Sequence, residues 1–452
     1  MAITNVLKKR LMKGESTQCG ISRWAALGFI LSMTACTSPT AADIRLSGVN
    51  GALWGGVDPA RAVDAMKDAG FNSMRLEFAW SLVEKKKGVF AWPPALAMPR
   101  KAVSLQQASG MKPLVALDYG NPALYPGTGK SQAFIDGFTR YAKWLATELK
   151  GSVRHFEVWN EWNGGIGLPC TYQNPQGICT GEAYVKLLCP VYAALKQVDP
   201  SIVVVGGATA GIDNRFIDDL IKNGGAKCLD VLSLHMYRYN KSSEPAEVTL
   251  SKLQSLQNRI KPIVGKEIPF YITETGVTVY RGGKHTLDKQ ADYLARFYLA
   301  AKAYPFIQGI WEYGLTDLNA RNLFQGSFGL MYRDFTPKPA YSAMQDVTGL
   351  FAESEFLGKV KSISDIWLLK FREPNGPYTY TVWSTGAATS TNLILNAPVA
   401  GALNIQEVGS DPIAVTKASF EAGSNAIKVA VSSTPRIIWV PGANIDITEA
   451  AK

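Results

Sequence analysis

The sequence is poor in the residues from which most metal and redox sites are built. Only three histidines occur among its 452 residues, and none belongs to an H-E-x-x-H motif, so a catalytic zinc site of that kind is excluded. The six cysteines form no C-x-x-C pair, so neither a zinc cluster nor a dithiol redox motif is predicted. We therefore expect no metal and no cofactor.

Two further catalytic signatures are missing. The glycine-rich stretch 206–211 lacks the lysine of a phosphate-binding loop, so it does not predict nucleotide binding. No G-x-S-x-G nucleophile elbow occurs, which argues against an ordinary serine hydrolase.

Concentrated charge is lacking outside the amino terminus. The formal net charge is +10, but five basic residues and one acidic residue lie in the first 35 positions, and the longest later basic run is Lys85–Lys87. Nucleic-acid-binding proteins gather basic residues on one patch, so we expect no nucleic acid partner, while a weakly anionic polymer stays open. With 47% hydrophobic and 19% charged residues, the chain is not mainly disordered.

The amino terminus has no apolar run long enough to span a membrane. The ten residues Trp24–Met33 fall short of a ~30 Å hydrocarbon core, but they follow the basic stretch 1–23 and precede small residues, as in a secretory signal. Cys36, after Met-Thr-Ala, resembles the lipidated cysteine of a bacterial lipobox; cleavage nearby, with Cys36 incidental, is the alternative. We predict a lipoprotein-type signal peptide over 1–35, a linker over 36–43, and an exported periplasmic or outer-membrane lipoprotein anchored to the membrane by its lipid.

Four cysteines remain after the predicted signal, and an even number suits disulfides in an oxidising compartment. Cys170 and Cys179 flank a loop rich in Pro and Gly, which favours a local bridge, and Cys189 with Cys228 would form the second. Buried free thiols are the alternative.

Short apolar segments and amphipathic helices alternate between Ile44 and about Phe351. Over Gln132–Lys150, for example, apolar residues recur at helical spacing and Gly151 ends the pattern. Eight near-continuous apolar runs are typical of parallel strands covered on both faces. Eight such units over about 300 residues predict an α/β fold, a (β/α)8 TIM barrel over 44–351. The runs are Leu46–Leu53, Ser73–Phe78, Pro113–Asp118, His155–Asn160, Ile202–Gly206, Val231–Met236, Phe270–Glu274 and Gln308–Tyr313.

The pattern changes after the predicted barrel. Short segments alternate between apolar and polar residues, are bounded by Gly, Pro, Asn and Ser, and show no helical period. This predicts a small antiparallel β-sandwich over 352–452.

Two glutamates stand at the ends of predicted strands. Glu161 follows the fourth strand in VWNEWN, and Glu274 ends the seventh in YITETG. In such barrels chemistry takes place at the carboxyl ends of the strands. A carboxylic acid facing a carboxylate suits glycosidic bond cleavage, with one group donating a proton and the other attacking. For any single glutamate, a solvated or salt-bridged position on the barrel rim is the alternative.

These two motifs resemble the signature pair of the clan A retaining glycoside hydrolases. The resemblance implies that Glu161 is the general acid and base and that Glu274 is the nucleophile. Within the clan the sequence is most similar to family 39, which includes β-xylosidases and biofilm polysaccharide hydrolases, with family 5 as a close competitor. Asn-Glu-Trp at residues 160–162 replaces the more frequent Asn-Glu-Pro.

The same resemblance assigns substrate-binding residues. Arg75 in SMRLEF would keep Glu274 ionised by proximity, and Asn160 would bond to the sugar 2-hydroxyl. His235 and Tyr237 end the sixth strand, where the clan often places a histidine and a tyrosine, so both are assigned to substrate binding, and Tyr237 would donate a hydrogen bond to Glu274. The aromatic residues expected to contact sugar rings are Trp162 and Trp311. Further carboxylates lie in or just beyond strands and either bind sugar hydroxyls or form salt bridges within the barrel: Glu77, Asp118, Glu157, Glu312 and Asp317.

We therefore expect an exported retaining glycoside hydrolase that cleaves a β-linked exopolysaccharide internally through a glycosyl-enzyme. Its partners would be a polysaccharide or oligosaccharide substrate, the membrane, and components of polysaccharide synthesis or export machinery. Two alternatives stay open: an exo-acting β-xylosidase-like glycosidase, and a catalytically inactive carbohydrate-binding scaffold of an export complex.

Overall fold

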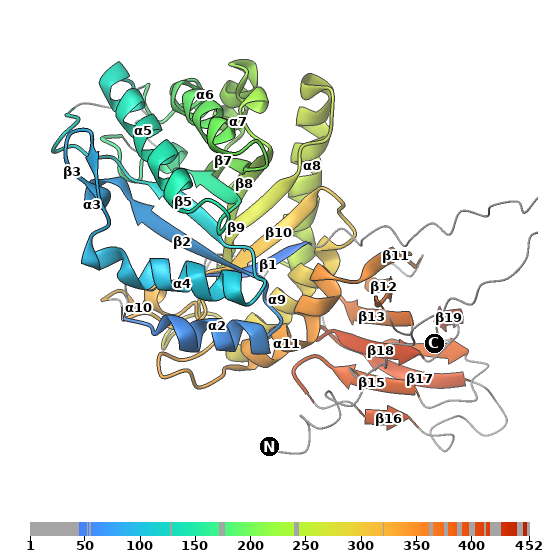
Figure 1. The fold of residues 1–452 in the computed structure, drawn as a ribbon. Helices are drawn as coiled ribbons and strands as arrows, with labels where there is room; N and C mark the ends of the chain where they lie inside the picture. Colours follow the sequence, from blue (N-terminus) through green and yellow to red (C-terminus); the bar gives the residue numbers. More distant parts are fainter. Residues whose placement is uncertain are drawn as a thin grey trace, which may run out of the picture. The chain divides into compact units, whose positions relative to one another are not determined.

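The computed structural model describes residues 45–51, 53, 56–126, 129–170, 177–238, 244–319, 321–360, 365–374, 378–386, 391–396, 403–410, 413–415, 426–440 and 446–449. The predicted signal peptide and linker, including Cys36, lie outside the described residues. Within the described part, eight parallel strands close into a barrel (Figure 1). This confirms the predicted (β/α)8 barrel. In their order around the barrel the strands are β1 Leu46–Asn50, β10 Ile307–Glu312, β9 Phe270–Val277, β8 Val231–Arg238, β7 Val203–Ala210, β6 His155–Val158, β5 Leu114–Asp118 and β2 Ser73–Ala79.

Helices surround the barrel strands (Figure 1). The longer ones are α2 Pro59–Asp68, α4 Ala97–Ala108, α5 Gln132–Glu148, α6 Gly181–Val198, α7 Asn214–Lys222, α8 Ala246–Val264, α9 Leu287–Ala301 and α11 Pro339–Ala352. Short elements occupy the connections: α3 Trp80–Val83, the hairpin of β3 Glu84–Lys86 and β4 Val89–Phe90, η2 Pro94–Leu96, η3 Trp162–Gly164, η4 Gly225–Lys227 and α10 Leu323–Gly326.

Polar side chains define where several helices begin. Asp58 accepts a hydrogen bond from the backbone N–H of Arg61 at 2.9 Å, and Pro59 is the first residue of α2. Ser131 caps α5 in the same way. The apolar face of α5 is buried, as its helical spacing predicts.

Strands β8 and β9 run further than their apolar runs predict, and their pairing is irregular. Leu234 pairs with Ile272, but the next residue, His235, pairs with Glu274, so one extra residue is accommodated in β9. A β-bulge of this kind changes the direction of neighbouring side chains and is common beside active sites. Here it places His235 and Glu274 opposite each other at the carboxyl ends of the strands.

Towards the amino-terminal ends of its strands, the barrel interior is filled by an apolar layer. Inward-facing side chains from six strands form this cluster, namely Leu46, Leu114, Val205, Val231, Tyr271 and Trp311. The layer closes the barrel below, so polar groups that face inward higher up can meet water or a ligand only at the carboxyl end.

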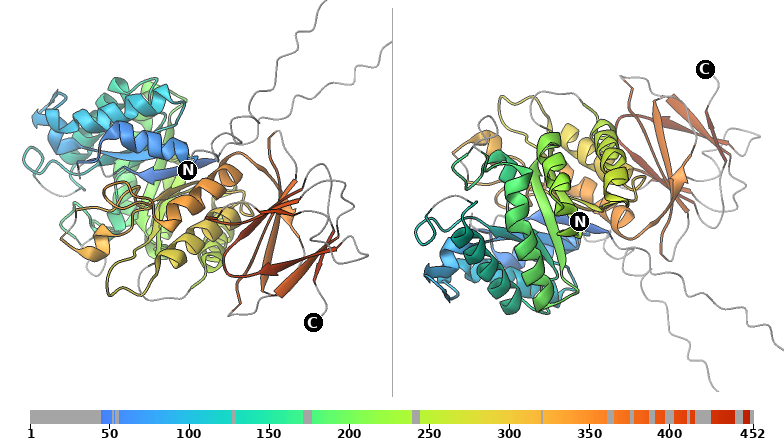
Figure 2. Two further views of the ribbon diagram at one scale, coloured as in Figure 1. Left: turned by 90° about the horizontal axis from the view of Figure 1, so that it is seen from below. Right: turned by 90° about the horizontal axis from the view of Figure 1, so that it is seen from above.

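The C-terminal strands form two antiparallel sheets (Figure 2). Buried side chains from both sheets share one apolar core, including Leu368, Val382, Val429 and Ile438. These sheets confirm the predicted sandwich fold. One sheet contains, in order, β11 Glu355–Lys359, β12 Ile366–Arg372, β13 Tyr378–Ser384, β18 Arg436–Val440, β15 Leu403–Glu407 and β16 Ile413–Val415. The other contains β17 Ala426–Val431, β14 Thr391–Asn396 and β19 Asp446–Glu449.

A buried polar group joins the sandwich to the barrel helices. Glu247 of α8 forms a two-pronged ion pair with Arg296 of α9, at 2.9 and 2.7 Å, and accepts a 2.6 Å hydrogen bond from the indole of Trp383 on β13. A bidentate guanidinium–carboxylate pair is both strong and directional. The contact therefore fixes β13 against two barrel helices.

Two disulfides are present, Cys170–Cys179 and Cys189–Cys228. Both pairings agree with the sequence prediction. The first closes the loop after η3, and the second links α6 to the residue that follows η4. Among the described residues, no helix combines the length and apolar character needed to cross a membrane.

Candidate active site

A cavity of about 770 Å³ opens at the carboxyl ends of the barrel strands. Its polar wall includes Arg75, Asn160, Glu161, Tyr237 and Glu274, and His235 contacts two of them, so the structure brings together six of the eight residues predicted to act on substrate. Apolar side chains line the rest of the wall, among them Leu53, Leu82, Leu96, Met98, Leu318, Phe324 and Phe328. A concave, largely apolar wall with a few convergent polar groups is typical of a small-molecule site.

Glu161 is held at the cavity by an unusual backbone. Strand β6 ends at Val158, and both Trp159 and Glu161 then adopt left-handed conformations, with φ of 72° and 51°. The backbone N–H of Glu161 donates to the carbonyl of Ala208, which is itself left-handed with φ of 42°. Each such residue costs about 1–2 kcal/mol. Strain of this kind persists where the surrounding structure fixes it and is concentrated at functional sites.

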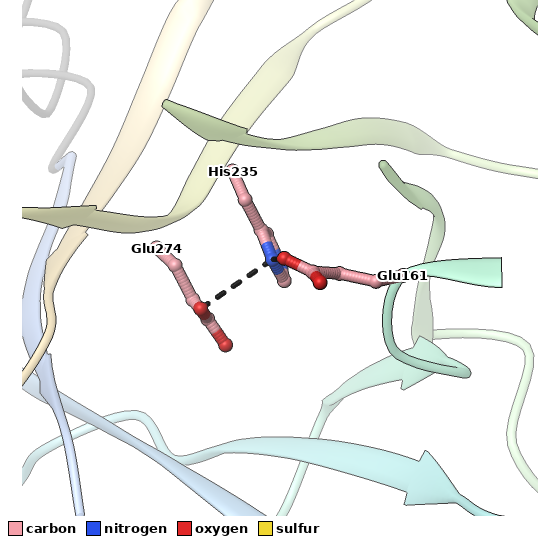
Figure 3. A group of neighbouring side chains, drawn as sticks. All are labelled: Glu161, His235 and Glu274. Carbon is pink, nitrogen blue, oxygen red and sulfur yellow. Dashed lines mark hydrogen bonds and ion pairs between the residues drawn. The ribbon is translucent and has the colours of Figure 1, made fainter. Parts of the chain in front are cut away.

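Glu161 and Glu274 both turn towards His235 (Figure 3). The Nδ1 atom of His235 lies 2.8 Å from Oε1 of Glu161 and 3.4 Å from Oε2 of Glu274. One oxygen of each carboxylate and the imidazole nitrogen all lie within 4.8 Å of one another. Carboxyl groups of retaining glycosidases are about 5–5.5 Å apart, whereas inverting enzymes need about 6.5–9.5 Å. The spacing therefore fits retention.

Arg75 connects the groups beneath the cavity. Its guanidinium donates to Glu157 at 2.6 Å, to Asn160 at 2.8 Å, to Asn50 at 2.9 Å and to Glu274 at 3.0 Å. Burial alone would lower the pKa of Arg75, but the charges of Glu157 and Glu274 outweigh it and raise the pKa above its ordinary value. Arg75 is thus a permanent cation between the two carboxylates.

Two donors orient Glu274. Arg75 reaches Oε1, and the hydroxyl of Tyr237 donates to Oε2 at 2.5 Å. The Glu274 side chain is 8% exposed, whereas that of Glu161 is 21% exposed. The two carboxylates therefore differ in how tightly they are held.

The proton needed by a general acid can be held by Glu161 or by His235, and the pKa values of the two groups decide between them. Burial would lower the pKa of His235, but the negative charge of Glu274 and the hydrogen bond to Glu161 raise it above its usual value. Burial would raise the pKa of Glu161, but the hydrogen bond from His235 lowers it. In the free protein the proton therefore lies on His235, 2.8 Å from Glu161.

Trp311 does not line the cavity, contrary to the sequence prediction. It is fully buried in the apolar layer, donates to Ser73 Oγ at 3.0 Å and packs against Tyr271. Side chains alternate along a strand, so the next inward residue after Trp311 is Tyr313, and this residue does line the cavity. The aromatic side chain that lines the cavity on this strand is therefore that of Tyr313, one layer of side chains above Trp311.

Trp162, which was also predicted to contact sugar rings, does not reach the cavity. It is fully buried, donates from its indole to the carbonyl of Ile178 at 2.7 Å, and packs between Trp159 and Tyr184. Because Trp162 begins η3, immediately after the left-handed Glu161, its side chain joins the core while Glu161 faces the cavity. Trp162 supports the loop that carries Glu161.

Two further residues hold Arg75 in place. The sequence analysis named Glu157 as a carboxylate that either binds sugar hydroxyls or forms a salt bridge within the barrel, and the structure shows the salt bridge. It did not name Asn50. Glu157 is fully buried beneath Arg75, and Asn50 accepts from Arg75 while donating to the carbonyl of Thr273. One signal was available for Glu157: a charged residue at an inward-facing strand position must be paired, and Arg75 is the inward cation on a neighbouring part of the barrel.

The triad Glu161, His235 and Glu274 is also the group that could hold a divalent ion, because each offers a ligand atom and these atoms lie within 4.8 Å. The same atoms are engaged with one another and with Tyr237 and Arg75. Ion binding would break these contacts.

Sequence comparisons agree with this geometry. The family model for cellulase (glycosyl hydrolase family 5) matches residues 37–314. A β-xylosidase of Caldicellulosiruptor saccharolyticus is 29% identical over 307 residues, 58% of this chain and 59% of the relative. A β-xylosidase of Geobacillus stearothermophilus is 24% identical over 248 residues, 51% of this chain and 46% of the relative. The chain thus spans about half of the length of these curated relatives.

Solved structures share the fold. A family 39 glycoside hydrolase of Bacteroides cellulosilyticus superposes with a TM-score of 0.72 at 24% identity, covering 88% of this chain and 81% of the other. A monomeric β-xylosidase of Caulobacter crescentus gives 0.62 at 14% identity, covering 88% and 96%. The barrel followed by a β-sandwich is therefore an architecture found in other proteins.

Proposed function

We propose that the chain is a retaining glycoside hydrolase acting on β-linked saccharides. It belongs to the cellulase family (glycosyl hydrolase family 5), one of the clan A glycoside hydrolases. Its fold is like that of a family 39 enzyme. The observation that carries the proposal is the pair of carboxylates, Glu161 and Glu274, which face one another within 4.8 Å at the mouth of the barrel. That spacing leaves room for a sugar but not for an attacking water between carboxylate and sugar.

In the first step Glu274 attacks the anomeric carbon and Glu161 protonates the departing oxygen. Arg75 and Tyr237 hold the two oxygens of Glu274, so the nucleophile is oriented before substrate arrives. The proton comes from the Glu161–His235 pair, since His235 can pass it across 2.8 Å to Glu161.

In the second step Glu161 accepts a proton from water, which attacks the sugar carbon and releases Glu274. Once Glu274 is esterified it carries no charge, so His235 loses a charge that raises its pKa. His235, which gave up its proton in the first step, therefore stays neutral, and the ionised Glu161 takes the proton of the attacking water. When hydrolysis restores the charge of Glu274, this proton returns to His235. Asn160, held by Arg75 at 2.8 Å and by Tyr119 at 3.1 Å, is positioned to bond to the sugar 2-hydroxyl.

We further propose internal cleavage of a polymer, an exopolysaccharide. The cavity of about 770 Å³ supports this, because its apolar lining includes Leu96, Met98, Phe324 and Phe328 beside the catalytic carboxylates. The curated relatives named β-xylosidase favour an exo-acting β-xylosidase as the second candidate. A mixture of oligosaccharides from a polysaccharide would support internal cleavage, and monosaccharide alone would support the second candidate.

The test of the reaction is the anomeric configuration of the first product. Proton NMR of fresh hydrolysate from 4-nitrophenyl β-xyloside and β-glucoside should show the β-anomer before mutarotation. The α-anomer would contradict retention. If the protein bound a saccharide but hydrolysed no β-glycoside, the result would instead support an inactive carbohydrate-binding scaffold of an export complex.

We also propose that the protein is exported and lipid-anchored at Cys36 and works with polysaccharide export components. The basic and apolar segments before Cys36 support this, and so do the two disulfides, which persist in oxidising compartments. Incorporation of labelled palmitate into the expressed protein, and its loss in Cys36→Ala, would test the anchor.

A further inference from the structure

Two carboxylates in the cavity are not used by the proposed reaction. Glu77 on β2 and Asp118 at the end of β5 both line the wall, on neighbouring strands of the barrel. Glu77 lies beside Arg75, with an Oε1–Nη1 distance of 3.7 Å, while the same nitrogen lies 3.0 Å from Glu274. The two carboxylates therefore border the sugar unit that Glu274 attacks.

Asp118 is buried without a hydrogen bond. It is 1% exposed, and neither of its carboxylate oxygens has a hydrogen-bond partner among the described residues. Leaving a buried polar group unsatisfied costs about 1–3 kcal/mol, and more for a charge. Asp118 belongs to the wall of the cavity, so a small movement of its buried side chain would bring an oxygen within reach of a donor on a ligand there.

The charge of the wall favours a cationic donor. Four described lining residues are acidic, namely Glu77, Asp118, Glu161 and Glu274. The cations that face them are Arg75 in the wall and the protonated His235 beside Glu161 and Glu274. The donors of Arg75 are already directed at Glu157, Glu274, Asn50 and Asn160. Burial raises the pKa of Asp118 well above its usual value, and the negative charge of Glu77 adds to this, so the empty cavity favours the protonated acid at Asp118, and a cation placed beside it would favour the carboxylate. A neutral hydroxyl would satisfy one hydrogen bond but would not stabilise Asp118 in its ionised form.

We propose that Glu77 and Asp118 bind a protonated amino group on the sugar that Glu274 attacks, so that the substrate is a β-linked saccharide containing a hexosamine with a free amine. This inference rests on the proposed glycosidase function. An ammonium carries three donors, and hydrogen bonds between charged partners are roughly twice as strong as neutral ones.

The test is a binding comparison of matched sugars. The 4-nitrophenyl β-glucoside, β-galactoside and β-mannoside are each compared with their monoamino derivatives at positions 2, 3, 4 and 6, with affinities measured by calorimetry. At least one amine should bind ten-fold or more tightly than its parent. If no amine exceeds its parent by more than two-fold, the carboxylates serve hydroxyl groups and the inference is overturned.

Variants assign the preference to residues. The amine preference is the ratio of the affinity for the amino sugar to that for its parent glycoside. Asp118→Asn and Glu77→Gln should each reduce this ratio at least five-fold, and should change the affinity for the parent glycoside by less than that. Glu182→Gln, the same change at an exposed residue of α6, is the matched control and should leave the preference intact. Because Glu77 is 40% exposed, its variant tests the idea even where Asp118→Asn fails to fold. A preference that survives in Glu77→Gln and in every folded Asp118 variant overturns the inference.

The readout separates this inference from the proposed function. An amine preference without turnover of any glycoside would contradict the glycosidase proposal and leave the recognition site standing. Hydrolysis of neutral glycosides with retention, but without an amine preference, would support the glycosidase proposal and contradict the amine-binding inference.

Discussion

Glu161 and Glu274 have different neighbours, and this difference assigns their roles. Glu274 is oriented by Arg75 and Tyr237 on both oxygens, while Glu161 contacts His235 and remains 21% exposed. An oriented anion suits attack on carbon, and a group that exchanges a proton with a neighbour suits acid and base catalysis.

Replacing Glu161 by Ala should impair the two steps unequally. With a 2,4-dinitrophenyl glycoside, whose leaving group needs no proton, the first step should survive and the second should slow by about 10²–10⁴-fold, the usual contribution of a general base. Azide should restore turnover and yield the β-glycosyl azide, because it needs no base to attack. Stopped-flow and product NMR measure this. If azide restored nothing, or gave the α-azide, the role of Glu161 would be wrong.

Replacing His235 by Asn should move the alkaline limb of the pH profile to lower pH. In the parent protein the limb follows the Glu161–His235 pair, in which the pKa of His235 is raised above 6.5. Without the imidazole the proton lies on Glu161, whose pKa, though raised by burial, starts from 4.5. The alkaline limb of kcat/KM against pH should therefore lie at lower pH in the variant than in the parent. An unchanged limb would mean that His235 does not carry the proton.

The site could be predicted from sequence only in part. The motifs around Glu161 and Glu274 indicated both glutamates, because each follows an apolar strand directly. The tryptophans were misassigned because sequence does not fix how deep an inward residue lies: Trp311 fills the apolar layer and Tyr313, two residues on, faces the cavity.

At the scale of elements, strand number was predictable and strand ends were not. Eight apolar runs correspond to eight barrel strands because parallel strands are covered on both faces. The runs stop short on β8 and β9, because the strands continue beyond Met236 and Glu274 to Arg238 and Val277, and polar residues such as Tyr237 are still paired there. The bulge between Leu234 and His235 has no sequence signal, since it arises from pairing between strands.

The disulfide between Cys189 and Cys228 should stabilise the fold more than the one between Cys170 and Cys179. The first joins residues 39 positions apart and the second 9. In the chain-entropy model these loops correspond to about 4 and about 3 kcal/mol. Double Cys→Ala variants of each pair, unfolded in urea, should lose stability in that order. Equal losses, or the reverse order, would contradict the entropic account.

At the scale of the molecule, the barrel supplies the site and the sandwich supplies support. Each lining residue that the structure describes belongs to the barrel and its loops, while Trp383 of the sandwich bonds to the buried Glu247–Arg296 pair. Membership of the clan and the two-part architecture were predictable, because they follow from motifs and from periodicity, whereas the motifs favoured family 39 over the family 5 model that matches. The contact through Glu247 was not predictable from the sequence, because it joins α8 to β13, two elements that are far apart along the chain.

Glu312 should make the stability of the whole molecule depend on pH. It is fully buried, neither carboxylate oxygen has a hydrogen-bond partner among the described residues, and burial raises its pKa well above the usual value. The native state therefore keeps a proton that the unfolded chain has released near neutral pH, so this group's contribution falls as pH rises from about 4 towards 7. Each unit of pKa difference corresponds to about 1.4 kcal/mol.

In Glu312→Gln this dependence should disappear. The difference in unfolding free energy between pH 4 and pH 7 should shrink relative to the parent, as measured by urea titration at both pH values. Glu353→Gln, near the end of α11 and exposed, is the matched control. An undiminished difference would mean that Glu312 is ionised in the native state.

The most direct test of the account is to trap the glycosyl-enzyme. A 2,4-dinitrophenyl 2-deoxy-2-fluoro-β-glycoside of the sugar that the protein hydrolyses should react once per chain, and intact-mass spectrometry should show one added fluoroglycosyl group. Proteolysis should place it on Glu274, and Glu274→Gln should remain unlabelled. Labelling of any other residue, or release of dinitrophenol without a stable adduct, would contradict the claim that Glu274 is the nucleophile.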